Sequence, residues 1–508
     1  MAAQHRAEPL PMTVRSRSAL GLVASVMVAS LAPACGTSSP GRPSGDDAAS
    51  AASTDSGHGH EGVRAEAGND SAPTPDSAEP DSSTEADSGS DGGVDGLADS
   101  GSGTARKDGG SPTATDVIVN PGTVHQRISG FGASTAWLGT TMSDVDADLA
   151  FSTTVGAGLS LDRIRINYQG DGTSATETAT ALKAQARGAK VWATPWTPPI
   201  ADKSNSNAVE GMLSNPSAFA TFLVNYVSAM KAAGVNLYAV SAQNEPDANV
   251  TYESCVYTGA SLATFIGSSM GPAFAGSSVK IMGPETQNWC SFPTYSSAIQ
   301  SNASAWSSIS IIATHEYGCT PAKPFPAAQQ AGKEFWETEI YDQVNNTADL
   351  TMNSGLVVAN LIYDALASAN MNAWHYWWIY PSTTDNGALW DSATKGPTKR
   401  LWVMGNFSRF VRPGFDRIDV SGPVPSGVSV IAFRNAADDT IAIVAINANT
   451  SSTALPLFVS GTSWPSQFTP WITSNSANLV AQTAVSLTGA RFSTTLVAQS
   501  VTTFVGKP

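Results

Sequence analysis

Residues 237–246 read Leu-Tyr-Ala-Val-Ser-Ala-Gln-Asn-Glu-Pro, a short apolar run that ends on an amide, an acid and a proline. A run of this length is typical of a buried strand, and the proline marks the point where the strand gives way to a loop. Residues 334–339, Glu-Phe-Trp-Glu-Thr-Glu, form a second short run that also ends on an acid. We therefore expect Glu245 and Glu339 to lie where two strands end and two loops begin.

Strand-like and helix-like stretches alternate between residues 125 and 407. The clearest helix candidates have apolar residues at helical spacing and cover residues 216–233, 261–275 and 356–368. The strand candidates are 127–132, 161–166, 190–194, 237–243, 280–284, 311–316, 334–339 and 373–378. These eight β–α units predict a TIM (β/α)8 barrel, which carries its active site at the C-terminal ends of the strands.

The residue composition and hydrophobic pattern of the sequence change after residue 410. Runs of β-branched residues separated by turn residues follow, at 428–434, 440–447 and 491–503. We predict a catalytic barrel over residues 116–410 and an all-β sandwich side domain over residues 411–508. Residues 116–124 are strand-like and are expected to pair with the β domain. The predicted fold class is α/β, a TIM barrel with an attached all-β sandwich.

The N-terminus has the pattern of an export signal over residues 1–35: a basic head, an apolar core at 19–32 and a small-residue exit. Cys35 resembles the lipid-acceptor cysteine of bacterial lipoproteins, although Ala32 stands where that motif usually has Leu. We expect an exported protein, and two alternatives stay open. One is a cell-surface or outer-membrane lipoprotein, and the other is a simply secreted protein.

Residues 36–115 are rich in Ser, Asp and Gly and hold almost no large apolar side chains. Such a segment cannot bury enough surface to offset its ordering entropy, so we predict a disordered acidic linker. Most of the chain's net charge of −15 lies there. The folded part is only mildly acidic.

Several classes of partner are disfavoured by the sequence. No basic stretch interleaved with aromatic residues suggests a nucleic-acid groove, and no nucleotide motif suggests a cofactor. A membrane contact is expected only through an N-terminal lipid anchor. We expect a monomer that acts on a polysaccharide and needs no cofactor.

The remaining cysteines, Cys255, Cys290 and Cys319, each follow a predicted barrel strand. An export compartment would permit one disulfide among them, and we favour a pair between Cys255 and Cys290. A metal site is the alternative. Neither a Cys-x-x-Cys pair nor a nearby His pair supports it, so we expect no metal.

The two acids suit the hydrolysis of a glycosidic bond. Glu245 can give a proton to the leaving oxygen while Asn244 binds a neighbouring sugar hydroxyl, although Asn-Glu-Pro could also be only a capped loop entry. Strand alternation places Glu337 and Glu339 on the same side, so periodicity does not choose between them. Glu339 lies nearer the C-terminal end of its strand and is the preferred nucleophile. Carboxyl groups about 5 Å apart would retain the configuration of the sugar.

Aromatic side chains gather at the predicted strand ends, and flat sugar faces stack on such rings. They are Trp137, Trp196, Tyr317, Trp377 and Trp378. Tryptophans are also common in protein cores, so each one alone is a weak indication of a sugar site. His315 could belong to a catalytic triad, but no Gly-x-Ser-x-Gly elbow accompanies it, and we expect a hydrogen-bonded histidine at the barrel rim.

Six segments, taken together and in order, resemble the motifs of glycoside hydrolase family 30, and the chain looks most like the xylanase branch over about residues 117–508. The segments are 128–132 (Ile-Ser-Gly-Phe-Gly), 194–199 (Thr-Pro-Trp-Thr-Pro-Pro), 243–246 (Gln-Asn-Glu-Pro), 315–318 (His-Glu-Tyr-Gly), 336–339 (Trp-Glu-Thr-Glu) and 406–414 (Asn-Phe-Ser-Arg-Phe-Val-Arg-Pro-Gly). The resemblance implies a barrel joined to a β-sandwich that both chain ends build.

The resemblance also implies roles for individual residues. It makes Glu245 the acid/base and Glu339 the nucleophile. It favours Trp196, Tyr317 and Trp377 as substrate-binding residues, whereas Trp137 and Asn244 are predicted substrate-binding residues from the residue pattern alone. Arg165 matches a basic position of the larger barrel clan that supports the nucleophile, and a structural ion pair is the alternative for it.

The resemblance predicts a retaining endo-β-1,4-xylanase. Glucuronoxylan-specific members of the family carry an arginine in the loop after the eighth strand, whereas residues 380–390 contain no base here, and Asp385 would repel a uronate. We therefore expect no strict requirement for glucuronic acid branches. The alternatives are another family 30 activity, such as glucosylceramidase or β-1,6-glucanase, and a non-catalytic surface carbohydrate-binding protein.

Overall fold

The computed structural model describes residues 110–318, 323–344, 348–380 and 385–508. The predicted export signal, Cys35, nearly all of the predicted linker, and Cys319 lie outside the described residues. Among the described helices, none is both long enough and apolar enough to cross a membrane.

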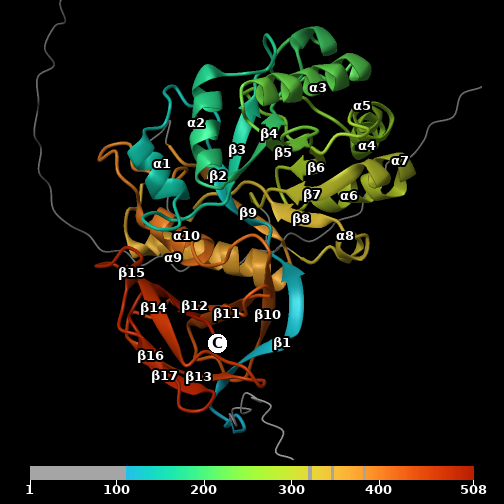
Figure 1. The fold of residues 1–508 in the computed structure, drawn as a ribbon. Helices are drawn as coiled ribbons and strands as arrows, with labels where there is room; N and C mark the ends of the chain where they lie inside the picture. The colour runs from blue at the N-terminus through green and yellow to red at the C-terminus, as the bar shows by residue number, and fades with distance from the viewer. Residues whose placement is uncertain (1–109, 319–322, 345–347, 381–384) are drawn as a thin grey trace, which may run out of the picture. The chain divides into compact units, whose positions relative to one another are not determined.

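Eight parallel strands close into a barrel, and its outer helices surround it (Figure 1). The barrel strands are β2 (Gly130–Ser134), β3 (Leu161–Ile166), β4 (Lys190–Pro195), β5 (Leu237–Ser241), β6 (Lys280–Thr286), β7 (Ile309–Thr314), β8 (Glu334–Glu337) and β9 (Ala373–Trp378). Pairing of β2 with β9 closes the circle. The predicted TIM barrel is confirmed, and each predicted strand overlaps one of these eight.

The helices of the barrel follow the predicted alternation. They are α1 (Asp144–Phe151), α2 (Ala175–Ala186), η1 (Ile200–Asp202), α3 (Pro216–Ala232), α4 (Gly259–Phe265), η2 (Ile266–Met270), α5 (Gly271–Ala273), α6 (Phe292–Ser301), α7 (Ala303–Ser308), α8 (Pro326–Gln330), α9 (Met352–Tyr363), η3 (Asp364–Ser368) and α10 (Lys399–Ser408). Helix α3 shows why its start was predictable: Pro216 fits the first turn, and the Asn215 side chain accepts from the N–H of Ala218.

The second part of the fold is a ten-stranded sheet with an apolar core of its own. Its strands are β1 (Val117–Arg127), β10 (Phe415–Ser421), β11 (Val428–Asn435), β12 (Ile441–Asn447), β13 (Thr453–Val459), β14 (Gln467–Thr473), β15 (Val480–Ala481), β16 (Val485–Ser486), β17 (Arg491–Leu496) and β18 (Ser500–Gly506). Strand β1 pairs antiparallel with β10 and parallel with β13, so an N-terminal strand completes a C-terminal sheet (Figure 1).

One predicted strand, 491–503, is two strands in the structure. Strands β17 and β18 are separated by a turn in which Gln499 has a φ of 44°. A positive φ cannot continue a strand, so the chain turns there despite its β-branched composition.

Large aromatic side chains fill the barrel. Trp192 of β4 and Trp336 of β8 are fully buried and meet edge to face with ring centroids 6.1 Å apart. Below them, Glu334 binds Lys280 and accepts from the Tyr238 hydroxyl at 2.8 Å. This packing closes the barrel interior and leaves the C-terminal strand ends to form the cleft.

Candidate active site

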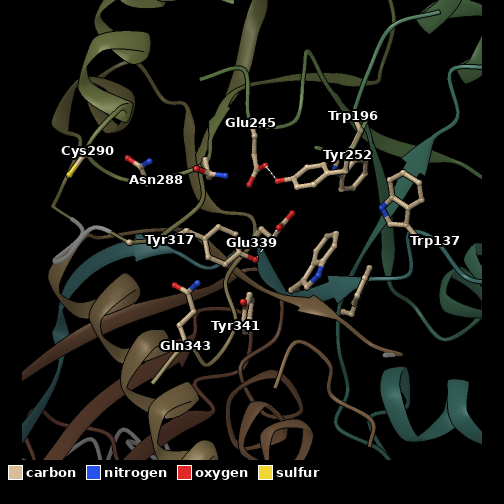
Figure 2. A pocket seen from close by; sticks show the side chains of 14 residues that line it. Trp137, Trp196, Glu245, Tyr252, Asn288, Cys290, Tyr317, Glu339, Tyr341 and Gln343 are labelled. Atoms are coloured by element: carbon tan, nitrogen blue, oxygen red, sulfur yellow. Dashed lines mark hydrogen bonds between the residues drawn. The ribbon is translucent and has the colours of Figure 1, made fainter. Parts of the chain in front are cut away.

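A cavity of about 940 Å³ opens at the C-terminal ends of the barrel strands (Figure 2). Glu245 and Glu339 both line it, and aromatic side chains surround them. Glu245 follows β5 and Glu339 follows β8, each a few residues beyond its strand. Both carboxyl groups point into the same space from different elements.

Glu337 lies deeper in the fold than Glu339 and does not line the cleft. Its carboxylate accepts from the backbone N–H of His375 at 2.8 Å, and the side chain is completely buried. Burial raises the pKa of Glu337 well above its usual value. The depth of the side chain, which strand alternation does not predict, therefore distinguishes Glu337 from Glu339.

The Glu339 carboxylate is held from two sides. A guanidinium N–H of Arg163 donates to one of its oxygens, and the Tyr317 hydroxyl donates to the other at 3.0 Å. Burial raises the pKa of Glu339, while His315 and Arg163 counter that rise. Both hydrogen bonds favour the charged form of the carboxyl group.

The prediction that Arg165 supports the nucleophile is wrong, because Arg163 makes that contact. Both arginines lie on β3 two positions apart, so strand alternation directs them to the same side. They differ in height. Arg163 is completely buried at the level of Glu339, whereas Arg165 lies nearer the rim and forms a two-point ion pair with Glu253, at 3.0 and 2.5 Å. The alternative interpretation of Arg165, a structural ion pair, holds.

Asn244 lies behind the cleft and is almost fully buried. Its carboxamide oxygen accepts from Arg163 at 2.6 Å, and its backbone N–H donates to the carbonyl of Pro195 at 2.9 Å. The predicted sugar contact would therefore involve a side chain whose oxygen is already held by Arg163.

His315 is buried between carboxylates rather than placed at an open rim. Its Nδ1 lies 3.3 Å from Oε1 of Glu245, and its Nε2 lies 3.5 Å from Oε1 of Glu285 and 3.9 Å from Oε2 of Glu339. Burial would lower the pKa of His315, but the surrounding carboxylates raise it to about 10. The imidazole is thus positively charged at neutral pH.

Glu285 was missed by the sequence reasoning. It ends the predicted strand 280–284 with its φ at 56°, and its side chain is completely buried. Oε1 accepts from Arg163 at 2.6 Å, and Oε2 accepts from the Thr194 hydroxyl at 2.8 Å. An acid directly after a predicted barrel strand was the signal that could have found it, as it found Glu245 and Glu339.

The predicted aromatic residues do converge on the cleft. Trp196 lies between Trp137 and Trp377, with ring centroids 5.7 and 6.0 Å away, and Trp377 stacks on Trp378 at 4.5 Å. Trp137 exposes 37% of its surface and rests on the Arg165 guanidinium, 3.9 Å from the ring centroid. Trp137 therefore exposes part of its ring to the cleft, while the Arg165 guanidinium makes a cation–π contact with that ring.

Tyr252 was also missed. It lies in the loop after β5, and its hydroxyl donates to Oε2 of Glu245 at 2.5 Å (Figure 2). The adjacent Glu253 anchors the loop through its ion pair with Arg165. No periodicity marks such a loop residue, so only the folded loop reveals the contact.

The predicted disulfide between Cys255 and Cys290 is wrong. Cys255 is a free, buried thiol, and burial raises its pKa to about 11. Cys290 lies at the exposed edge of the cleft and is disulfide-bonded, so its partner lies outside the described residues. The two cysteines differ in depth, since Cys255 is completely buried and Cys290 is exposed.

The cleft has a group of side chains with the spacing of metal ligands. Glu245, His315 and Glu339 each offer one ligand atom, and these atoms lie within 4.8 Å of one another. A protonated imidazole has no lone pair to donate to a cation, however, and the pKa of His315 is about 10. The arrangement suits an imidazolium paired with two carboxyl groups better than a metal centre.

Comparisons with known proteins agree with this architecture. The family described as Glycosyl hydrolase family 30 TIM-barrel domain matches residues 175–347. The Glucuronoxylanase XynC of Bacillus subtilis (strain 168) is 33% identical over 410 residues, which cover 77% of this chain and 92% of that protein.

Two solved structures are similar along most of the chain. The family 30 subfamily 8 xylanase Xyn30A from Clostridium acetobutylicum superposes with a TM-score of 0.70 at 34% identity, covering 77% of this chain and all of that one. A GH30 endoxylanase from Clostridium papyrosolvens C71 gives a TM-score of 0.67 at 31% identity, covering 78% and 100%. The resemblance inferred from the six motifs is confirmed: the chain belongs to glycoside hydrolase family 30, in its xylanase branch.

Proposed function

We propose that the protein is a retaining endo-β-1,4-xylanase that cuts the xylan backbone, with Glu245 as acid/base and Glu339 as nucleophile. The proximity of the acids carries the proposal, since a carboxylate oxygen of each lies within 4.8 Å of the other. Retaining glycosidases hold their carboxyl groups about 5 Å apart, whereas inverting enzymes leave about 6.5 to 9.5 Å for a water molecule. The separation supports direct attack by Glu339 on the sugar.

The reaction has two halves. First, a Glu339 oxygen attacks the anomeric carbon while Glu245 gives its proton to the departing sugar oxygen, so one C–O bond forms as another breaks. Then Glu245 takes a proton from water, and the water oxygen displaces Glu339. Arg163 and Tyr317 keep the attacking carboxylate in position throughout.

The choice of xylan rests on the relatives, which are named as xylanases, and on the aromatic cleft, which suits flat sugar rings. Product analysis on a panel of xylans and β-glucans tests it. Preference for a β-1,6-glucan or a glucosylceramide would point to another activity of the family. If no sugar is released, a non-catalytic carbohydrate-binding protein would be favoured. The anomer that appears first in proton NMR tests retention.

We expect comparable turnover of glucuronoxylan and of undecorated xylo-oligosaccharides. Residues 380–390 contain neither Arg nor Lys, so this loop has no guanidinium to pair with a uronate. Arg400 lies nearby but is buried, and it already donates to the carbonyl of Ala388 at 3.0 Å. The kcat/KM values on the two substrates should agree within about tenfold, which corresponds to about 1.4 kcal/mol. Strict dependence on the branch would contradict the proposal and would direct attention to Lys395, an exposed cation beyond the loop.

Tyr252→Phe should lower kcat/KM on xylan about tenfold. The substitution removes the hydrogen bond to Glu245, and a hydrogen bond between uncharged groups contributes about 0.5 to 1.5 kcal/mol. The effect should shrink on a dinitrophenyl xylobioside, because that leaving group departs without a proton. An equal loss on both substrates would show that Tyr252 acts on sugar binding and not through the acid.

A further inference from the structure

Three carboxyl groups and two cations meet at the cleft floor and directly beneath it. We call Glu245, Glu285, Glu339, Arg163 and His315 the charge cluster. Five ion-pair contacts within the cluster are 3.9 Å or shorter, and each involves the buried Arg163 or His315. The proposed reaction uses Glu245 and Glu339 and leaves the third carboxyl group without a task.

Glu285 touches every other member of the cluster except Glu339. Its side chain binds Arg163 at 2.6 Å and lies 3.5 Å from Nε2 of His315. Its backbone carbonyl accepts from the N–H of Glu245 at 2.9 Å. Glu339 is reached through Arg163, which donates to both carboxylates. One residue of β6 therefore contacts the supports of both proposed catalytic acids.

Glu285 is charged although it is completely buried. Burial would raise its pKa, but Arg163 and His315 lower that pKa to about 2. An unpaired buried carboxylate would be strongly destabilising, so the anion and the two cations depend on one another. The charge of Glu285 is thus a fixed feature of the site at any working pH.

The fixed charge balances the cluster in both halves of the proposed reaction. Before attack, with Glu245 protonated, the anions Glu339 and Glu285 face the cations Arg163 and His315. After attack, the Glu245 proton has gone to the leaving oxygen and Glu339 is esterified, so the anions are Glu245 and Glu285. The number of anions equals the number of cations in both states, while one negative charge moves from Glu339 to Glu245.

We propose, building on the function above, that Glu285 is a positioning residue that keeps His315 protonated and Arg163 in place, so that negative charge can pass between the two catalytic acids without unbalancing the buried site. His315 is suited to this because its two nitrogens face different acids, Glu245 through Nδ1 and Glu339 through Nε2. The imidazolium changes its main partner as the charge moves and does not itself give up a proton.

The titration of His315 depends on charged groups from several neighbouring strands. The loop after β5 contributes Glu245 and, farther away, Asp247; β6 contributes Glu285; β8 and its loop contribute Glu337 and Glu339; β3 contributes Arg163. On β9, burial lowers the pKa of His375 to about 3, so that imidazole is neutral. Glu285 is the member of this set that stays anionic in both halves of the reaction.

Glu285→Gln tests the proposal, with Glu337→Gln as a matched control. Both are completely buried carboxyl groups, one on β6 and one on β8, but Arg163 and His315 lower the pKa of Glu285 to about 2, whereas burial raises the pKa of Glu337 well above its usual value. The same isosteric change therefore removes an ion-paired carboxylate at Glu285 and, at Glu337, a carboxyl group that forms no ion pair within the described residues. Circular dichroism and thermal unfolding establish that each variant folds.

Two readouts are used. Imidazole NMR of the whole chain, which has six histidines, follows the protonation of His315 without any substrate. In the unsubstituted protein His315 should stay an imidazolium up to about pH 9, since its pKa is about 10. In Glu285→Gln that titration should move to lower pH, because one of the anions that stabilise the imidazolium is gone. Glu337→Gln should move it much less, because the direct contacts of His315 in the described part of the chain are with Glu245, Glu285 and Glu339 and not with Glu337.

The second readout is kinetic. Glu285→Gln should lower kcat on xylan about 10²-fold, comparable to the loss of one preorganised electrostatic contact, with little change in KM because Glu285 does not line the cleft. The alkaline limb of its pH–activity profile should also move to lower pH. Glu337→Gln should stay within about twofold of the unsubstituted protein, a difference well under 1 kcal/mol.

Several results would overturn the proposal. A neutral His315 at pH 7 in the unsubstituted protein would do so even if Glu285→Gln fails to fold. An unchanged titration of His315 in a folded Glu285→Gln would do so as well. An equal kinetic loss in Glu337→Gln would show that any buried carboxyl group here acts structurally. Absence of xylan hydrolysis by the unsubstituted protein would instead contradict the proposed function and leave the NMR result intact.

Discussion

Glu339→Ala is expected to reduce xylan hydrolysis by a factor on the order of 10⁴ to 10⁶, the range typical of removing a covalent nucleophile. The variant keeps Glu245 and the aromatic cleft, so substrate binding should survive and KM should change little. Without the carboxylate, no covalent glycosyl-enzyme can form. Reducing-sugar release from xylan, followed over hours at high enzyme concentration, measures the loss.

Chemical rescue identifies the role of the missing group. Azide is small enough to enter the space that the side chain leaves, and it should attack an activated dinitrophenyl xylobioside from the vacated face. A single displacement inverts the anomeric centre, so the product should be the α-glycosyl azide. A β-glycosyl azide from this variant would assign the nucleophile to another residue.

Glu337→Gln is the control for Glu339→Ala. Glu337 lies two positions earlier, at the end of β8, is fully buried and accepts from the backbone N–H of His375. Burial raises its pKa well above the usual value, and it forms no ion pair within the described residues, so an amide of the same shape should cause little loss. Comparable losses in the two variants would mean that this strand end tolerates no change, and that the Glu339 result says nothing about a nucleophile.

The barrel was predictable because each strand is a short apolar run and its hydrophobic period differs from that of the helices. The same reasoning placed Glu245 and Glu339 at strand ends, and the structure brings both into one cleft. Residues whose placement follows from the end of an element are therefore within reach of sequence reasoning. The break between β17 and β18 was not, since a single positive φ at Gln499 interrupts an otherwise continuous β-branched run.

The errors within the site arise because periodicity predicts only which side of a strand a side chain faces. It predicts neither the depth of that side chain along the barrel axis nor the shape of a loop. Arg163 and Arg165 have the same parity on β3, yet only Arg163 reaches Glu339. Cys255 and Cys290 both follow barrel strands, yet one is buried and the other is exposed. Tyr252 reaches Glu245 only through the shape of its loop. Depth and loop shape are properties of the folded chain.

Glu245→Ala is expected to reduce xylan hydrolysis about 10² to 10⁴-fold, the contribution typical of a general acid/base. The loss should nearly vanish for the first half-reaction on a dinitrophenyl xylobioside, whose leaving group needs no proton. That substrate should give a burst of dinitrophenol followed by slow turnover, because the glycosyl-enzyme forms on Glu339 but no base activates water. Azide should speed the second step and yield the β-glycosyl azide, since two inversions retain the configuration.

The two azide products test the assignment as a pair. An α-product from Glu339→Ala and a β-product from Glu245→Ala require that the two acids act in sequence, one on each half-reaction. The reverse pattern would exchange the two roles. Identical products from both variants would contradict a covalent glycosyl-enzyme intermediate. The charge cluster predicts the first pattern, because Arg163 holds Glu339 as an anion ready to attack, while Tyr252 and His315 contact Glu245. Glu339, which is ion-paired with an arginine, is thereby suited to attack, and Glu245, which is not, is suited to exchange a proton.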